Sequence, residues 1–540
     1  MKFHYRAFIF LLLLLHGCAS LSTPGGGPKD VQPPVLLQSS PSNNQTGFTG
    51  KTIELTFNEM VLLNNPKEEI IISPSPGKLL DFKMKGGTKV TIHSPEGWKD
   101  STTYSILFRE GIQDATEKNV PPELKLAFST GPSIDSLRIR GVVTDLLKGT
   151  PADKMTVGIY ASDTFDLFTD VPGYFTKSDK KGNFMIENIK AGSYKIYAFD
   201  DKNKNLIVES RSERYGFRAQ DILLDSNVDS IHMGLVMVDS RPLKITAIRN
   251  VGTLTRVRFN KFIEDYSIQP DSSLVHSYGD NQTEIMLWNP PSTTDSLRLH
   301  LHATDSIENK LDTIFYIKKT DVNPVNETFK WTTGSPNVIA ETGKFSMVLK
   351  SNKPVIEINF DSIYVAVDTT SKIHFSKEDI IVNMMKKEIA VSKQFDKLLF
   401  KTEKEPKLVL NTGKGFIISA DNDSTRASSK PVDITWPEQT GIILIETATR
   451  EKSYIIQLLN KEGNTVNSIQ NTAKFTFKSL LPAEYQIRII IDTNKNGKWD
   501  VGNIKMGIEP EKVRYYKNPA GKQSFPVRAN WELGPLKLSF

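Results

Sequence analysis

Short segments in which apolar and polar residues alternate run through most of the chain. Residues 52–57, 89–92 and 103–108 follow this period of two, which places alternate side chains on opposite faces of a strand. Turn residues such as Lys181-Gly182-Asn183 separate the segments, and residues 376–385 form a rare short candidate helix. Short strands with regular turns between them predict an all-β fold of tandem β-sandwich domains.

A three-strand pattern recurs three times along the chain. Its first strand ends at Phe57-Asn58-Glu59, at Phe259-Asn260-Lys261 and at Phe360-Asp361. The second strands are expected at 90–92, 285–287 and 398–400, and the third at 104–108, 297–301 and 407–410. Two of the repeats close alike, at 127–131 and 330–334, and the third ends near Thr435-Trp436. The recurrence predicts three related sandwiches.

The first of these sandwiches, residues 33–131, carries several short motifs. They are Pro41-Ser42, Phe57-Asn58-Glu59, Thr102-Thr103-Tyr104, Ile112-Gln113-Asp114 and Phe128-Ser129-Thr130-Gly131. With these motifs the segment resembles the bacterial Ig-like domain of S-layer and envelope proteins. The other two sandwiches are assigned to the same type through the internal repeat.

A second repeat has a constant offset of 291 residues. Residues 184–194 align without a gap on 475–485, residues 201–205 fall on 492–496, and Gly216 falls on Gly507. The first copy also contains the strand-like segments 139–143 and 157–160 and a hairpin glycine, Gly182, that suits a positive φ. This copy resembles the prealbumin-like domain, also called carboxypeptidase-regulatory-like, and the resemblance implies a seven-stranded sandwich.

The resemblances of these repeats, together with the N-terminal segment described in the next paragraph, predict the following order of segments. Residues 1–17 are a signal peptide and 18–32 a lipidated cysteine with a flexible tether; 33–131 are a bacterial Ig-like domain, 132–237 a prealbumin-like domain, 238–334 and 335–440 diverged Ig-like sandwiches, and 441–540 a second prealbumin-like domain.

The N-terminal segment predicts export and lipid anchoring. Lys2 and Arg6 precede an apolar run at 7–15, which is about half the ~20 residues that a membrane-spanning helix needs. The ending Leu15-His16-Gly17-Cys18 resembles the lipobox, although His16 departs from it, and the resemblance implies a diacylated Cys18. An ordinary secretory signal with a chance cysteine is the alternative. Gly and Pro in the following residues predict a flexible spacer.

Composition narrows the class of protein further. A chain of 540 residues is too long to fold around a single hydrophobic core, so several domains are expected. A single cysteine allows no intrachain disulfide. The 68 Lys and Arg nearly balance the 62 Asp and Glu, giving +6, and the charges are mixed along the chain, so no nucleic-acid partner is expected.

The most chemical-looking stretch is a loop rich in oxygen ligands. Asp492, Asn494, Asn496, Asp500 and Asn503 occupy positions 1, 3, 5, 9 and 12, Gly497 occupies position 6, and Lys498 offers a carbonyl at 7. The loop resembles the calcium loops of surface adhesin B-type repeats and dockerins, with Asn503 in place of their bidentate glutamate. We therefore expect a weak Ca²⁺ site, which Glu509 could complete, with an Asx-rich turn as the alternative. In the earlier copy, 200–209, the turn is favoured because the glycine is missing.

Other candidate chemistry is sparse. His300 and His302 share one face of a predicted strand, with Asp305 as a candidate third metal ligand, but two surface histidines are the favoured interpretation. The tryptophans are scattered and are expected in cores or between domains. The sequence contains no Gly-x-Ser-x-Gly, His-Glu-x-x-His or phosphate-binding glycine motif.

We therefore expect a non-enzymatic protein, held to the outer membrane by lipid on Cys18, that acts as a scaffold or binding rod for another envelope protein or a polysaccharide. The periplasmic face is favoured over the cell surface, because no acidic cluster follows Cys18. Two alternatives stay open. One is a glycan-capture or hydrolase-accessory module, which requires an exposed aromatic platform. The other is an unrecognised enzyme with a site within 242–441.

Overall fold

The computed structural model describes residues 30–76, 80–161, 165–251, 254–269, 274–288, 296–318, 327–401 and 405–540. Within these ranges the chain is almost entirely β-structure, which confirms the predicted fold class, and the α-helix α2 is a single turn at Pro66–Glu69. No helix in them has the length and apolar character to cross a membrane. The predicted signal peptide, Cys18 and most of the tether lie outside the described residues.

Five successive groups of strands, called here the first to fifth units, each enclose a hydrophobic core. In the first unit, the sheet β1-β2-β6-β5 packs on β4-β7-β9, and β3 pairs with β8. Ile53, Leu55, Tyr104 and Phe128 from the two sheets meet in its core. The strands are β1 Leu36–Ser40, β2 Thr52–Phe57, β3 Val61–Leu63, β4 Ile71–Ser73, β5 Asp81–Lys85, β6 Lys89–His93, β7 Thr103–Leu107, β8 Ile112–Asp114 and β9 Lys125–Ser129.

The third unit repeats this topology. Its sheets, β19-β20-β23-β22 and β21-β24-β25, have the strand orders of the two main sheets of the first unit. The three strands expected from the sequence repeat all form, in β20, β23 and β24. The strands are β19 Ile245–Val251, β20 Leu254–Phe259, β21 Asp265–Gln269, β22 Val275–Tyr278, β23 Glu284–Trp288, β24 Ser296–Thr304 and β25 Lys310–Lys318.

The fourth unit keeps the topology but not the predicted alignment. Its order β27-β28-β33-β32 matches β1-β2-β6-β5, so β28 takes the place of β2. The strands are β26 Trp331–Thr333, β27 Asn337–Ile339, β28 Lys344–Ser351, β29 Val355–Ile358, β30 Ile363–Ala366, β31 Lys372–His374, β32 Ile380–Val382, β33 Glu388–Gln394, β34 Val409–Thr412, β35 Ile417–Ser419, β36 Ser428–Pro431 and β37 Asp433–Thr435.

Four predictions that concern this unit are therefore wrong. The segment around 356–360 pairs with β35, as β3 pairs with β8, and the expected strand at 398–400 is the 3₁₀ turn η4, Lys397–Phe400. The candidate helix at 376–385 is the 3₁₀ turn η3, Lys377–Asp379, followed by β32, because the β-branched run 380–382 favours a strand. Trp331–Thr333 pair with β28 of this unit rather than with the third. The domain limits themselves stay predictions.

The second and fifth units share one topology. In the second, β10 pairs antiparallel with β14 and parallel with β18; in the fifth, β38 pairs antiparallel with β41 and parallel with β45. The facing sheets are β13-β12-β15-β16 with β17, and β40-β39-β42-β43 with β44. The strands are β10 Leu137–Asp145, β11 Thr150–Pro151, β12 Thr156–Ala161, β13 Tyr174–Lys177, β14 Asn183–Ile189, β15 Gly192–Phe199, β16 Tyr215–Phe217, β17 Ile222–Leu224, β18 Val228–Leu235, β38 Gly441–Ala448, β39 Ile455–Asn460, β40 Thr465–Gln470, β41 Lys474–Leu480, β42 Ala483–Ile490, β43 Val513–Tyr515, β44 Ser524–Val527 and β45 Glu532–Ser539.

The repeat extends to single atoms. Strands β14 and β41, like β15 and β42, begin and end at residues 291 apart. The hydroxyl of Tyr194 donates to the carbonyl of Lys190 at 2.8 Å, and that of Tyr485 donates to Leu481 at the same distance. Two aligned segments that share the tyrosine but differ in the four residues before it thus build the same loop.

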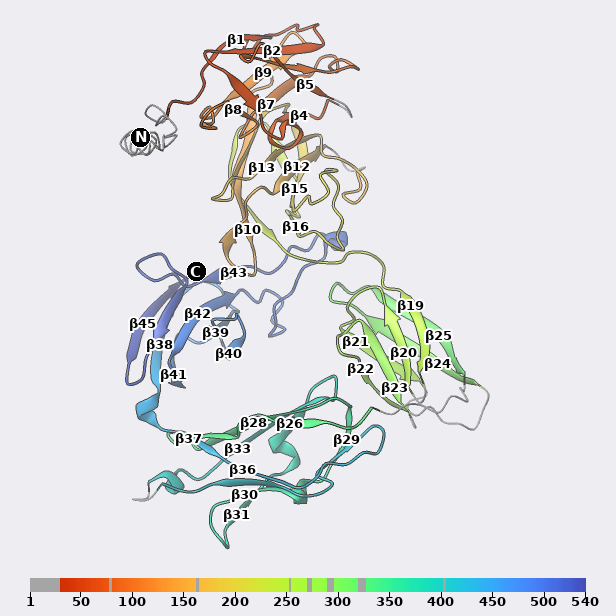
Figure 1. Cartoon of the computed structure of the whole chain (residues 1–540), viewed down its shortest axis with the longest axis vertical. Coiled ribbons are helices and arrows are strands. Elements are labelled where there is room, and N and C mark those ends of the chain that lie inside the picture. Colours follow the sequence, from red (N-terminus) through yellow and green to blue (C-terminus); the bar gives the residue numbers. More distant parts are fainter. Residues whose placement is uncertain are drawn as a thin grey trace, which may run out of the picture.

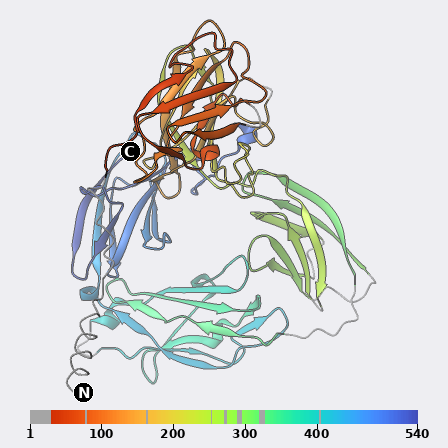
Figure 2. The same ribbon diagram turned by 45° about the horizontal axis from the view of Figure 1, so that its top comes forward.

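The units do not form the extended rod that the sequence suggested. The second to fifth units follow one another around a closed circuit, and the first unit stands on the second, outside the circuit (Figures 1 and 2). Gln523 of the fifth unit donates to the carbonyl of Gly149 in the second at 3.0 Å, although 374 residues separate them. The chain closes because the fifth unit carries a loop that packs on both the second and third units.

Candidate functional site at the junction of three units

The loop that follows β42 is organised around one buried carboxylate. Asp492, 3% exposed, accepts the backbone N–H groups of Asn496 at 3.0 Å and Gly497 at 3.1 Å. Gly497 has a φ of 78°, which glycine adopts without strain. The side-chain amides of Asn494 and Asn496 both donate to Asp500 Oδ2 at 2.7 Å. Four of the six sequence-predicted calcium residues therefore belong to one compact polar network.

The other two predicted residues face the third unit. Lys498 Nζ lies 2.6 Å from Glu264 Oε1. Asn503 caps the 3₁₀ turn η6, Ile504–Met506, through its side-chain oxygen Oδ1, which accepts from backbone N–H groups of the turn. Its side-chain amide donates to the carbonyl of Ile307 at 2.7 Å. Glu509, the expected completing ligand, accepts the backbone N–H of Ala219 in the second unit. These side chains hold units together.

Glu511 is a member of the loop that the sequence did not indicate. Its carboxylate accepts the N–H groups of Thr493 at 2.6 Å and Asp500 at 3.2 Å, and burial raises its pKa. In the second unit Glu213 does the same for Lys202 and Glu209, and burial also raises its pKa. The constant offset of 291 residues hides this equivalence, because Glu213 and Glu511 are 298 residues apart. The chain between Asp500 and Glu511 is seven residues longer than the chain between Glu209 and Glu213.

The first copy of the loop is also closer to the second than expected. Asp201 accepts the N–H groups of Asn205 and Leu206, as Asp492 does for Asn496 and Gly497. Leu206 has a φ of 62°, so it adopts the left-handed conformation that Gly497 provides. The missing glycine has therefore not changed the path of the backbone.

An apolar contact accompanies the polar one. Trp499, Val501 and Ile504 pack against a cluster of the second unit that includes Tyr160 and Phe199. Ile307 of the third unit is buried in the same cluster. Side chains of three units thus share one core, which explains why the circuit closes at this loop.

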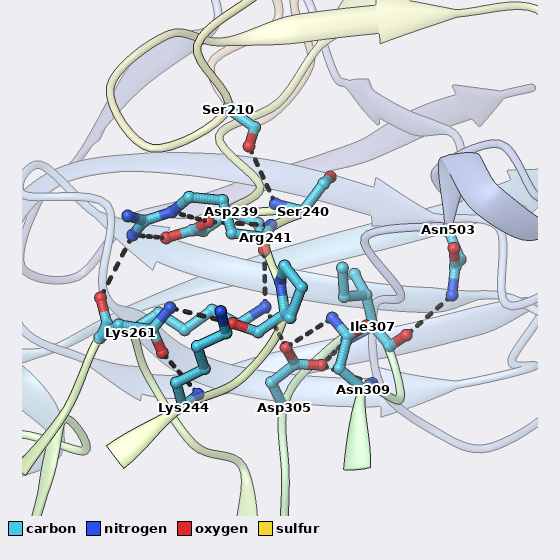
Figure 3. A network of polar contacts seen from close by, with 12 residues as sticks. Ser210, Asp239, Ser240, Arg241, Lys244, Lys261, Asp305, Ile307, Asn309 and Asn503 are labelled. Atoms are coloured by element: carbon cyan, nitrogen blue, oxygen red, sulfur yellow. Dashed lines mark hydrogen bonds and ion pairs between the residues drawn. The ribbon is translucent and has the colours of Figure 1, made fainter. Parts of the chain in front are cut away.

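A buried ion pair fixes the connection between the second and third units (Figure 3). Lys261, 7% exposed, contacts the carboxylate of Asp305, 5% exposed, and also donates to the carbonyl of Asp239 at 2.9 Å. Asp305 accepts the N–H groups of Ile307 and Asn309 at 3.1 and 2.9 Å. The carboxylate of Asp305 is therefore bonded to Lys261 and to the backbone. The prediction that it could join His300 and His302 as a third metal ligand is wrong.

Arg241 completes this network. Its Nε lies 2.8 Å from Asp239 Oδ1 and its Nη2 lies 2.5 Å from Oδ2, a bidentate arrangement. Although burial alone would raise the pKa of Asp239, the hydrogen bonds and charge of Arg241 hold it below its usual range. This network of charged side chains therefore holds the second and third units in a fixed orientation.

The remaining candidates lie elsewhere. His300 and His302 are neighbours on β24, with Asp312 of β25 between them. Five tryptophans, Trp98, Trp288, Trp331, Trp436 and Trp499, belong to or pack against hydrophobic clusters, and the guanidinium of Arg528 covers the ring of Trp531 at 4.6 Å. Two cavities, of about 740 Å³ between the first and second units and about 780 Å³ between the second and fifth, are lined by residues outside 242–441.

Comparison with known proteins identifies the first unit. Residues 30–130 match the family of the bacterial Ig-like domain. The chain therefore contains a bacterial Ig-like domain followed by further β-sandwiches. No curated protein matches its sequence.

Solved structures resemble the chain only loosely. Domains 1–6 of the surface layer protein SbsC share 11% identity, over 91% of this chain and 67% of that one, with a TM-score of 0.15. An L,D-transpeptidase from Mycobacterium smegmatis shares 12% identity over 38% of this chain and 90% of that one, with a TM-score of 0.14. The Bacteroides ovatus protein SGBP-B, solved with a mixed-linkage heptasaccharide, shares 11% identity over 62% and 83%, with a TM-score of 0.14.

Proposed function

We propose that this chain is a non-enzymatic structural protein of a bacterial cell envelope, held to the outer membrane by lipid on Cys18, preferentially at the periplasmic face. The closed circuit formed by its second to fifth units would bind another envelope protein or a polysaccharide. The observation that carries the proposal is the junction of the second, third and fifth units, which joins distant parts of the chain into one frame. The bacterial Ig-like match at 30–130 supports the envelope.

The use of polar side chains supports a non-enzymatic role. Asp305 and Lys261 are paired with each other and bonded to backbone groups, and the carboxylate of Asp239 is paired with Arg241. Lys498 and Asn503 connect two units. A general acid or base needs access to a substrate proton, whereas these groups are satisfied within the protein. Their arrangement fits a role in holding shape.

The partner can be sought directly. We expect the lipid-anchored full chain, crosslinked in its native envelope and purified, to retain a defined envelope protein or polysaccharide. A variant that lacks two of the loop contacts, Lys498→Ala with Trp499→Ala, should retain less of it, because the closed circuit is weakened. Equal recovery with both proteins, or substrate turnover by the purified chain, would contradict the proposal.

Lipid anchoring is tested separately. Two or more acyl chains hold a protein stably at a membrane, so the wild-type chain should sediment with outer membranes and carry a lipid mass on the peptide that begins at Cys18. The Cys18→Ala chain should be recovered in the soluble envelope fraction. Membrane recovery of this variant would show that some other contact holds the protein there.

A further inference from the structure

The outer face of β24 carries two adjacent imidazoles. His300 and His302 alternate with Leu299 and Leu301, which are fully buried in the third unit. Both histidines therefore project from the same face of the sheet, and their ring centroids lie 4.4 Å apart. Each side chain remains partly open to solvent.

The neighbouring strand supplies a carboxylate at the same place. Asp312 of β25 lies directly opposite His302 in the antiparallel register. One of its oxygens contacts His300 Nε2, and the other lies 3.0 Å from His302 Nδ1. One ligand atom from each of the three residues lies within 4.8 Å of the others. The sequence did not indicate Asp312, because only the hairpin register brings it to the histidines.

We propose that His300, His302 and Asp312 bind a divalent transition-metal ion of the zinc or copper type. Two imidazoles with one carboxylate suit these borderline cations, whereas Ca²⁺ and Mg²⁺ prefer oxygen ligands throughout. Three protein ligands leave a coordination position free, and the exposure of all three side chains directs that position toward solvent. The site is thus suited to take water or a group from a partner as its last ligand.

The backbone beneath the site is regular. Strands β24 and β25 pair continuously from Ser296–Lys318 to Thr304–Lys310, with no bulge. Ligands on adjacent strands of a regular sheet are held more firmly than ligands on loops. The carboxylate already lies between the two rings, so a cation can enter by rotation of side chains alone.

Zinc binding tests the proposal. The full chain, purified without a polyhistidine tag, is titrated with Zn²⁺ against a chromophoric chelator. We expect one zinc per chain, and at least tenfold weaker binding in His302→Asn and in Asp312→Asn. His374→Asn is the matched control, because His374 is an exposed strand histidine of the fourth unit, and its affinity should equal that of the wild type.

A second measurement distinguishes a built site from casual binding. Co²⁺ bound by His300, His302 and Asp312 should give visible absorption bands that disappear in the double variant His300→Asn/His302→Asn, with unchanged circular dichroism. Unchanged zinc affinity in His302→Asn and Asp312→Asn would overturn the proposal. A loss of zinc affinity in His374→Asn as large as that in His302→Asn would also overturn it. Displacement of bound zinc by excess Ca²⁺ would do so too.

Discussion

At the scale of single residues, the connection between the second and third units depends on the pair Lys261–Asp305. Removing one partner of a buried ion pair leaves an uncompensated charge and costs about 3–5 kcal/mol. We expect Asp305→Ala to destabilise the third unit by this amount, and Lys261→Met/Asp305→Asn to recover part of it. Hydrogen exchange of β20 and β24 measures the change. Equal exchange in wild type and Asp305→Ala would contradict the prediction.

The repeated tyrosines give a matched pair of substitutions. Tyr194 and Tyr485 each donate one hydrogen bond to a carbonyl four residues upstream. Loss of such a bond costs about 1 kcal/mol. Tyr194→Phe and Tyr485→Phe should therefore destabilise their own units to a similar extent, as measured by local hydrogen exchange. A large difference between the two losses of stability would mean that the two hydrogen bonds, despite equal geometry, contribute unequally to the stability of their units.

Glu511 predicts a particular pH dependence. Burial raises its pKa in the folded chain, so the folded state binds this proton more tightly than the unfolded state. Its contribution to stability is present below the ordinary glutamate pKa and is lost as the pH rises through the raised value. Between pH ~4 and ~7, the melting temperature of the wild type should fall relative to that of Glu511→Gln. A constant difference between the two proteins would contradict this.

At the scale of elements, the loop 492–503 remains a predicted calcium site. Asp492, Asp500 and Glu511 place three carboxylates in one loop, and only weak binding is expected from so few charges. Millimolar Ca²⁺ should raise the melting temperature of the wild type, and the rise should be smaller in Asp500→Asn, which retains the size of the side chain. Lack of any rise in the wild type would leave an Asx-rich turn that docks the fifth unit.

Many of the strands could be predicted from the sequence, because they depend on the local pattern of apolar and polar residues. Alternation placed three strands of the first unit, the recurring pattern placed three of the third, and the ungapped repeat located β14 and β41. The fourth unit was misaligned because Leu398-Leu399-Phe400 is as apolar as a strand, yet Asp396 caps it into a 3₁₀ turn. Asp312 and Glu511 were missed since their partners come from another strand or from beyond an insertion. Contacts of this kind are fixed by tertiary register, which spacing does not encode.

At the scale of the whole molecule, the closed circuit predicts a measurable size. Replacing Lys498, Trp499 and Asn503 together by alanine removes three of the side chains through which the loop contacts the second and third units. Small-angle scattering should then show a larger radius of gyration, with unchanged circular dichroism. Trp531→Ala, which alters a ring exposed elsewhere on the fifth unit, is the control. Identical scattering from the triple variant would mean that other contacts keep the circuit closed.

The shared core at the loop also has a consequence for biogenesis. The cluster that contains Tyr160 and Phe199 leaves the ribosome long before Trp499 and Ile504, which pack against it. During synthesis, this cluster of the second unit therefore lacks part of its apolar cover, and exposed apolar surface is bound by chaperones and cut by proteases. A product truncated before residue 499 would keep that part of the cluster uncovered, so proteases should remove it faster than the full chain.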